Sequence, residues 1–267
     1  MNPGKASQLY LICILLFACG NPGSESGDTF GDLLADVPSI SGRDAYLSSP
    51  YVTAGDRVYM VGHQDGSFPE LGWHIKGEMG GIWDHPIKLM DGFDALLTID
   101  GADIPLRNAS RFTNYPMAGR HDYNLDSLGL KVERWQFVPD GKEGLVLEYV
   151  FHNTGKADKP VEFGFTGHAD LRPTWLGERT GMVDGKDRAR FDTDLQAWVV
   201  KDSLNPWHVI YGSNLPVESH SGRPTPYPGN GTSSQLTYSL EIPLEGRKYI
   251  RVYISGSYTS EADARAT

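Results

Sequence analysis

Cysteine is nearly absent from this chain, whose 267 residues include only Cys13 and Cys19. Both lie within or directly after a short apolar N-terminal run, which is typical of a signal peptide. We therefore expect the folded domain to contain no cysteine. This absence excludes disulfides, thiolate metal sites and a nucleophilic cysteine from the folded domain.

Basic residues and metal-binding motifs are also scarce. The 24 Lys and Arg residues are outnumbered by 34 Asp and Glu residues, which gives a formal net charge of −10 and argues against a nucleic-acid partner, because such partners require a basic face. The eight histidines show no HxH or HExxH spacing, so we expect no metal site and no cofactor. The acidic segment 184–194 lacks the ligand order of a calcium-binding loop, and a solvated loop is the preferred interpretation.

The N-terminal apolar run, residues 9–18, is too short to span a bilayer comfortably. It ends in LFACG at residues 16–20, which resembles a bacterial lipobox with cleavage before Cys19 and lipid on its sulfur. An ordinary signal peptide with a chance cysteine is the alternative. The prediction is a signal peptide at 1–18, a lipidated Cys19 with a flexible tether over 19–44, and a lipid anchor to a membrane of the bacterial cell envelope.

Long amphipathic helices and short internal repeats are missing as well, whereas short strand-like segments are frequent. Turn signals separate these segments, which favours a single all-β sandwich domain over residues 45–267. Three hairpins are predicted from neighbouring segments: 145–151 with 161–165, 197–200 with 207–211, and 236–242 with 249–258.

The stretch from Gly66 to Asp100 shows neither helical nor strand periodicity over most of its length. Its glycines permit tight backbone reversals, and Trp73 and Trp83 argue against disorder. We therefore predict a long structured loop that enters a strand near residues 95–100. Loops of this length inside compact domains are usually functional.

Within this stretch, the run GEMGGIWDHPIKLMDGF resembles the N-terminal β-domain of glycoside hydrolases of the glycogen-debranching and α-glucosidase kind, the family 63-like group. The resemblance extends over roughly residues 45–267. It implies a galactose-mutarotase-like supersandwich of antiparallel sheets, which in those enzymes precedes an (α/α)6 barrel that carries the catalysis. The chain departs from the family in length, since it stops at Thr267, where the linker into the barrel would be expected.

The resemblance implies a non-catalytic domain that supports a separate (α/α)6 barrel acting on α-glucans or related oligosaccharides. No catalytic residue is assigned, because the clustered carboxylates of the loop are more often turn formers. Trp83 could instead belong with Ile87 to a hydrophobic plug beneath the loop. The residues expected to contact the substrate or the barrel are Trp73, His74, Glu78, Trp83, His85 and Lys88.

Two other functions stay open at this point. One is a stand-alone glycan-binding envelope lipoprotein. The other is a mutarotase-like enzyme, because the supersandwich fold is shared with sugar mutarotases that use histidine and glutamate for acid–base chemistry. His168 with Asp170, or His63 with Glu78, are the candidate pairs for that chemistry. The chain alone is expected not to hydrolyse α-glucans.

Overall fold

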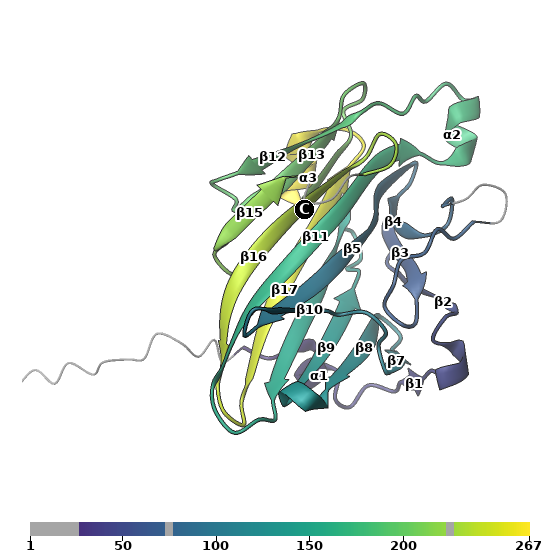
Figure 1. The fold of residues 1–267 in the computed structure, drawn as a ribbon. Helices are drawn as coiled ribbons and strands as arrows, with labels where there is room; N and C mark the ends of the chain where they lie inside the picture. Colours follow the sequence, from purple (N-terminus) through teal and green to yellow (C-terminus); the bar gives the residue numbers. More distant parts are fainter. Residues whose placement is uncertain (1–26, 73–76, 223–226) are drawn as a thin grey trace, which may run out of the picture.

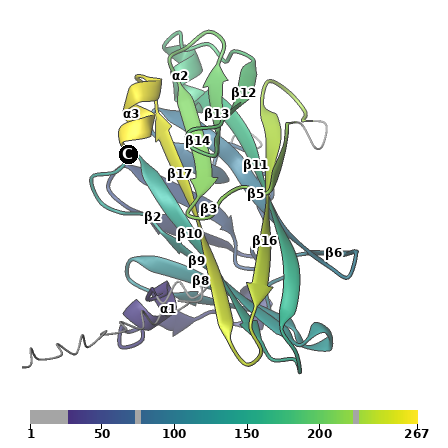
Figure 2. The same ribbon diagram turned by 90° about the vertical axis from the view of Figure 1, so that its left-hand side faces the viewer.

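The computed structural model describes residues 27–72, 77–222 and 227–267. Within them, two large antiparallel sheets face each other, as Figures 1 and 2 show. The first sheet contains, in spatial order, β1 (Ile40–Ser41), β7 (Arg111–Asn114), β8 (Ala118–Leu125), β9 (Leu130–Phe137), β10 (Gly144–Asn153), β17 (Arg247–Ser257), β14 (His208–Ser213), β13 (Ala197–Asp202) and β12 (Asp187–Asp192).

The second sheet contains, in spatial order, β15 (Ser219–Gly222), β16 (Thr232–Ile242), β11 (Lys159–Pro173), β5 (Ile87–Ile99), β4 (Gly81–Asp84), β3 (Val58–His63) and β2 (Pro50–Ala54), and β6 (Ala102–Pro105) pairs with β5. The helices are short: α1 (Phe30–Leu33), α2 (Trp175–Arg179), α3 (Glu261–Ala266) and the 3₁₀ turns Asp44–Tyr46 and Asp126–Leu128. Among the helices in the described part of the chain, none is long and apolar enough to cross a membrane.

The core lies between the two sheets. Tyr149 of β10 and Phe163 of β11 are both fully buried, and their ring centroids lie 4.9 Å apart across the sandwich. Strands turn alternate side chains to opposite faces, so each sheet contributes one row of apolar residues to this core. The predicted all-β supersandwich is confirmed.

One of the three predicted hairpins is confirmed and two are wrong. Strands β13 and β14 pair, with Trp198 opposite Tyr211. By contrast, β10 pairs with β9 and β17, whereas β11 pairs with β5 and β16. Strands β16 and β17 likewise belong to different sheets. Alternation shows which face of a strand is buried, but a short turn can lead either to a neighbouring strand or to the opposite sheet.

The predicted long loop is wrong over much of residues 81–94, because β4 occupies 81–84 and β5 begins at Ile87, whereas the strand predicted near 95–100 is confirmed as the end of β5. All four residues of β4 are buried, and so are residues 87–90 at the start of β5, whereas buried and half-buried residues alternate over 93–99. A strand buried on both faces shows no alternation, so the two-residue period that identifies a half-buried strand is missing there. Trp73 and His74 lie outside the described residues.

The folded domain begins earlier than the predicted boundary at residue 45. Thr29 caps α1 with a capping box and is 2% exposed. The Phe30 backbone N–H donates to Glu148 Oε1 at 2.6 Å, and Asp32 forms an ion pair with Arg247. The second half of the predicted tether is therefore packed on the first sheet. Residues 1–26, with the predicted signal peptide and Cys19, lie outside the described residues.

The acidic segment 184–194 is also not a solvated loop throughout. Its middle forms β12, which pairs with β13. Asp187 is 2% exposed, and its Oδ2 accepts a hydrogen bond from the Leu171 N–H at 2.8 Å. This carboxylate therefore belongs to the interior rather than to the surface.

Candidate functional site

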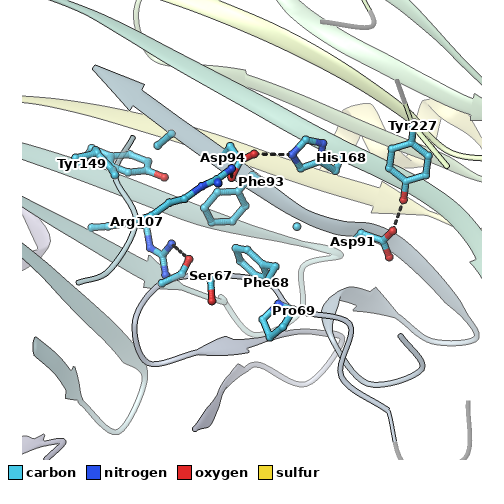
Figure 3. Close-up of a pocket in the computed structure, with 15 residues that line it drawn as sticks. Ser67, Phe68, Pro69, Asp91, Phe93, Asp94, Arg107, Tyr149, His168 and Tyr227 are labelled. Carbon is cyan, nitrogen blue, oxygen red and sulfur yellow. Dashed lines mark hydrogen bonds and ion pairs between the residues drawn. The ribbon is translucent and has the colours of Figure 1, made fainter. Parts of the chain in front are cut away.

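A pocket opens where the second sheet is interrupted beside β5. Strand β4 pairs with β5 as far as Met90, and β6 pairs with it from Leu96 onward. Between these positions β5 has β11 on one side and, in the described structure, no strand on the other. The pocket has a volume of about 400 Å³, within the usual range for small-molecule sites. Figure 3 shows its lining residues.

An aromatic wall forms one side of this β5 pocket. The rings of Phe68 and Phe93 meet edge to face, with centroids 4.7 Å apart. Phe68 lies directly over Gly92, where a Cβ atom would be 2.4 Å from the Phe68 ring. Only glycine fits at this position of β5, so the close approach of Phe68 depends on the missing side chain.

The rim of the pocket carries a polar chain centred on Asp94. Asp94 accepts from Arg107 Nη2 at 3.0 Å and lies 3.1 Å from His168 Nε2 (Figure 3), whose Nδ1 lies 2.8 Å from Ser233 Oγ. The hydrogen bond from His168 lowers the pKa of Asp94, although burial opposes the shift, and the charge of Arg107 adds to it. Asp94 is therefore an ionised acceptor near neutral pH, with an exposed side-chain fraction of 42%.

Asp91 lies at the other side of the rim. It forms an ion pair with Lys88 and accepts a hydrogen bond from the Tyr227 hydroxyl (Figure 3). Burial opposes ionisation of Asp91, but the charge and hydrogen bond of Lys88 outweigh it, so its pKa is lowered. Lys88 itself is 1% exposed and donates to the Gly77 carbonyl oxygen at 3.1 Å.

A second pocket of about 420 Å³ adjoins the first and shares Phe68, Pro69 and Asp91 with it. Its wall includes Asp170, whose Oδ2 lies 3.1 Å from Arg172 Nε. Burial raises the pKa of Asp170 to about 6, and Asp91 adds to the shift. The two pockets together form a continuous polar depression along β5 and β11.

Of the six residues expected to contact a substrate or a barrel, the structure describes four and does not gather them in one pocket. Lys88 lines the second pocket. Trp83 is 2% exposed, and its Nε1 donates to the Gly80 carbonyl at 3.1 Å, which agrees with the alternative of a buried plug. His85 stacks on Tyr59 and Trp83 outside the lining of both pockets. Glu78 is half-buried in the loop before β4. Contact between these residues and a substrate or a barrel stays a prediction.

One of the two predicted acid–base pairs, His168 with Asp170, is replaced by a different one, whereas His63 with Glu78 stays a prediction. The carboxylate beside His168 is that of Asp94, whereas Asp170 pairs with Arg172. Sequence reasoning missed Asp94 because it was expected in a loop. A signal was available, since Lys88, Asp91 and Asp94 interrupt an otherwise apolar strand, and charged residues are rarely buried without a partner or a function.

No protein-family model matches this chain, and no curated protein matches it in sequence. Solved structures do match its fold. They include a protein named as a kojibiose phosphorylase from the human microbiome (TM-score 0.50, 9% identity, 85% of this chain and 34% of that one). They also include a protein named as an aldose 1-epimerase from Escherichia coli K12 (0.53, 7%, 79% and 99%) and the Slr1438 protein of Synechocystis sp. PCC 6803 (0.51, 10%, 78% and 96%).

These similarities concern the fold. The chain spans about a third of the length of the phosphorylase and nearly all of the epimerase. The supersandwich that the resemblance implied is therefore found both as part of a longer sugar-processing protein and as a whole protein named for sugar epimerisation. The chain has the galactose-mutarotase-like supersandwich fold.

Proposed function

We propose that this chain is a carbohydrate-binding β-domain of a sugar-processing system and that a saccharide binds in the β5 pocket. The observation that carries the proposal is the interruption of the second sheet, which opens a pocket of about 400 Å³ with an aromatic wall and a charged rim. The fold neighbours named for sugar chemistry support this choice of ligand.

The chemistry of the pocket suits a sugar. Each sugar hydroxyl both donates and accepts hydrogen bonds, and the rim offers the acceptor Asp94 beside the donor Arg107. The rings of Phe68 and Phe93 offer an apolar surface to the C–H face of a sugar ring. A few fixed polar groups on an apolar wall are typical of small-molecule sites.

Calorimetric titration with a panel of neutral and acidic mono- and oligosaccharides tests the proposal. Asp94→Asn removes the charged acceptor and should weaken binding about tenfold or more, since hydrogen bonds to charged groups contribute about 1.5–3 kcal/mol. His152→Gln is a matched control, because His152 lies on β10 and does not line the pocket. Equal affinities for wild type and Asp94→Asn would contradict the assignment of the site.

A finer form of the proposal concerns the partner. The chain corresponds to 34% of the phosphorylase, which favours a supporting, non-catalytic role beside an (α/α)6 catalytic barrel that acts on α-glucans or related oligosaccharides. The test is activity on maltose and starch in the presence of such a barrel, with and without this chain. A barrel that works equally well without the chain argues against the supporting role.

The envelope location is also a proposal, and LFACG at residues 16–20 supports it. A lipid-anchored domain would meet extracellular or periplasmic glycans. The intact mass of the mature protein should show acylated Cys19. An unmodified N-terminus at another residue would contradict the lipid anchor.

An aldose epimerase is the second candidate function. His168 and Asp94 meet at the rim of the pocket, and the chain matches 99% of a protein named as an aldose 1-epimerase. Both ring nitrogens of His168 already have protein partners, which favours the binding role. Polarimetry with freshly dissolved α-anomers separates the two functions: epimerisation that disappears in His168→Gln would favour the enzyme.

A further inference from the structure

A buried cation lies at the inner end of the β5 pocket. Arg134 of β9 lines the pocket and is 2% exposed. Its Nη1 donates to the Gly66 carbonyl at 2.9 Å, and its Nη2 lies 3.4 Å from the Tyr51 hydroxyl and 2.9 Å from His121 Nδ1. Burial, and then the charge of Arg134, hold the pKa of His121 well below its usual value, so this ring is neutral.

Arg134 has no carboxylate partner in the part of the chain that the structure describes. Its remaining contacts are the rings of Phe93 and Phe68, with centroids 5.3 and 6.0 Å from the guanidinium carbon. Such contacts stabilise a cation, but they do not replace an anionic partner. The charge of Asp65 also acts on Arg134, but Asp65 Oδ1 accepts its hydrogen bonds from Ser67 rather than from Arg134. A buried charge without a directly paired counter-charge is costly, so this arginine favours an anion in the pocket.

Donors without acceptors surround this cation. Within the described residues, neither Arg134 Nε nor the hydroxyls of Tyr123 and Tyr149 have a hydrogen-bond partner. Tyr149 lines the pocket and is fully buried, and Figure 3 shows its hydroxyl directed toward the pocket interior. Burial raises the pKa of Tyr149, so the hydroxyl keeps its proton and can donate it in a hydrogen bond.

The acidic residues of the pocket are already neutralised at its rim. Asp94 is paired with Arg107 and His168, and Asp91 with Lys88. Positive charge at the inner end is therefore not compensated by these carboxylates. A neutral sugar would leave this imbalance, whereas a sugar that carries one negative charge would remove it.

We propose that the β5 pocket takes an acidic sugar, a uronic acid residue, whose carboxylate reaches Arg134 and the Tyr149 hydroxyl. The planar guanidinium fits a planar carboxylate. A phosphate dianion would meet stronger repulsion from Asp91 and Asp94 while gaining only one cation. This inference rests on the proposed saccharide site and names its ligand class.

The test compares matched ligands on the full chain by calorimetry. The acids are the methyl α-glycosides of glucuronic and galacturonic acid, and the neutral counterparts are methyl α-glucoside, methyl α-galactoside and the methyl esters of the two uronates. Wild type should bind a uronate at least tenfold more tightly than its neutral counterpart. The preference should decrease with increasing salt, because charge attraction is screened.

Tyr149→Phe is the informative variant, because it removes one hydroxyl and keeps the ring in the core. It should weaken uronate binding about tenfold and leave binding of the neutral glycosides unchanged. Tyr253→Phe is the control, since Tyr253 is 44% exposed and does not line the pocket. Arg134→Met should abolish the preference for uronates over neutral sugars if this variant folds. If it does not fold, Tyr149→Phe still tests the proposal.

The outcomes separate this inference from the proposed function. Equal binding of acidic and neutral sugars, unchanged in Tyr149→Phe, overturns the inference and leaves the saccharide site standing. Binding of no saccharide overturns both. Tighter binding of glucose 6-phosphate or glucose 6-sulfate than of either uronate overturns the assignment of a carboxylate.

Discussion

At the scale of single residues, the most informative feature is a set of charged side chains that are buried. Asp84, Lys88, Arg134 and Glu148 are each at most 2% exposed. Lys88 and Glu148 have ion-pair partners of opposite charge, Asp91 and Arg251. A buried charge without such a partner either shifts its pKa, as Asp84 does, or favours a ligand of opposite charge, as we propose for Arg134.

The first prediction concerns Asp84. Its Oδ2 has no hydrogen-bond partner in the described structure, and burial, with the charge of Glu143, raises its pKa to about 7 while Arg57 opposes the shift. The folded state therefore holds a proton that the unfolded state releases near pH 4. Protonated Asp84 therefore makes its full contribution to the free energy of unfolding below about pH 4. This contribution is lost as the pH rises toward 7, by up to about 1.4 kcal/mol per pH unit.

Asp84→Asn removes this titration. On going from pH 4.5 to pH 8, the free energy of unfolding should therefore fall less in the variant than in wild type, as measured by urea denaturation at both pH values. Asp100→Asn is the control, because Asp100 is exposed in a turn. A difference between wild type and Asp84→Asn that stays constant with pH would show that Asp84 does not titrate in this range.

The second prediction concerns the core. Phe163 is fully buried against Tyr149, Phe151 and Tyr238. Phe163→Ala should lower the free energy of unfolding by about 3–5 kcal/mol, because it removes packed apolar surface and leaves a cavity. Tyr253→Ala, at an exposed position of β17, should cost far less. Similar losses in both variants would place Phe163 outside the core.

At the scale of elements, β5 is the strand that builds the site. It pairs with β11 along most of its length, with β4 at its start and with β6 at its end. The interruption between β4 and β6 leaves the edge of β5 open, and Gly92 lets Phe68 close over it. Binding loops and strand irregularities commonly coincide, because an unpaired backbone edge is free to face a ligand.

Sequence patterns predict half-buried strands well and fully buried ones poorly. The segment 249–258 was predicted as a strand and lies almost wholly in β17, where the buried Ile250, Val252 and Ile254 alternate with more exposed residues. Strand β4 and the first half of β5 were predicted as loop, since burial of both faces over 81–84 and 87–90 removes the alternation. The pairing of His168 with Asp94 depends on the register of β5 and β11, which no local pattern contains.

The third prediction concerns the N-terminal segment. A chain that starts at residue 45 loses the Phe30 N–H bond to Glu148 and the packing of Phe30 on Phe137. A lost hydrogen bond to a charged group costs about 1.5–3 kcal/mol, so the Tm should fall by several degrees relative to a chain that starts at residue 27. Phe30→Ala should reproduce part of this loss. Equal Tm values would restore the tether as predicted from the sequence.

At the scale of the whole molecule, the fold provides two sheets with a core between them and a polar depression along β5 and β11. The same fold occurs as a whole protein named for sugar epimerisation and as a third of a protein named as a phosphorylase. A fold of this kind supports several functions. The site therefore decides the function, and its paired carboxylates favour binding.

The fourth prediction is that the chain alone releases no reducing sugar from maltose, starch or glycogen. Glycoside hydrolysis needs a protonated acid and a second carboxylate about 5–10 Å away. The pKa values of Asp91 and Asp94 are lowered, by Lys88 and His168 respectively, so neither is a proton donor near neutral pH. Turnover that disappears in Asp170→Asn would contradict this, because burial raises the pKa of Asp170 to about 6.

The central claim is tested most directly by a crystal structure with the saccharide that binds most tightly in solution. We expect the sugar ring to lie against Phe68 and Phe93, with polar contacts to Asp94 and to the floor of the pocket at Arg134 and Tyr149. A saccharide bound elsewhere, for instance on the stacked rings of Phe191 and His220, with nothing in the β5 pocket, would contradict it.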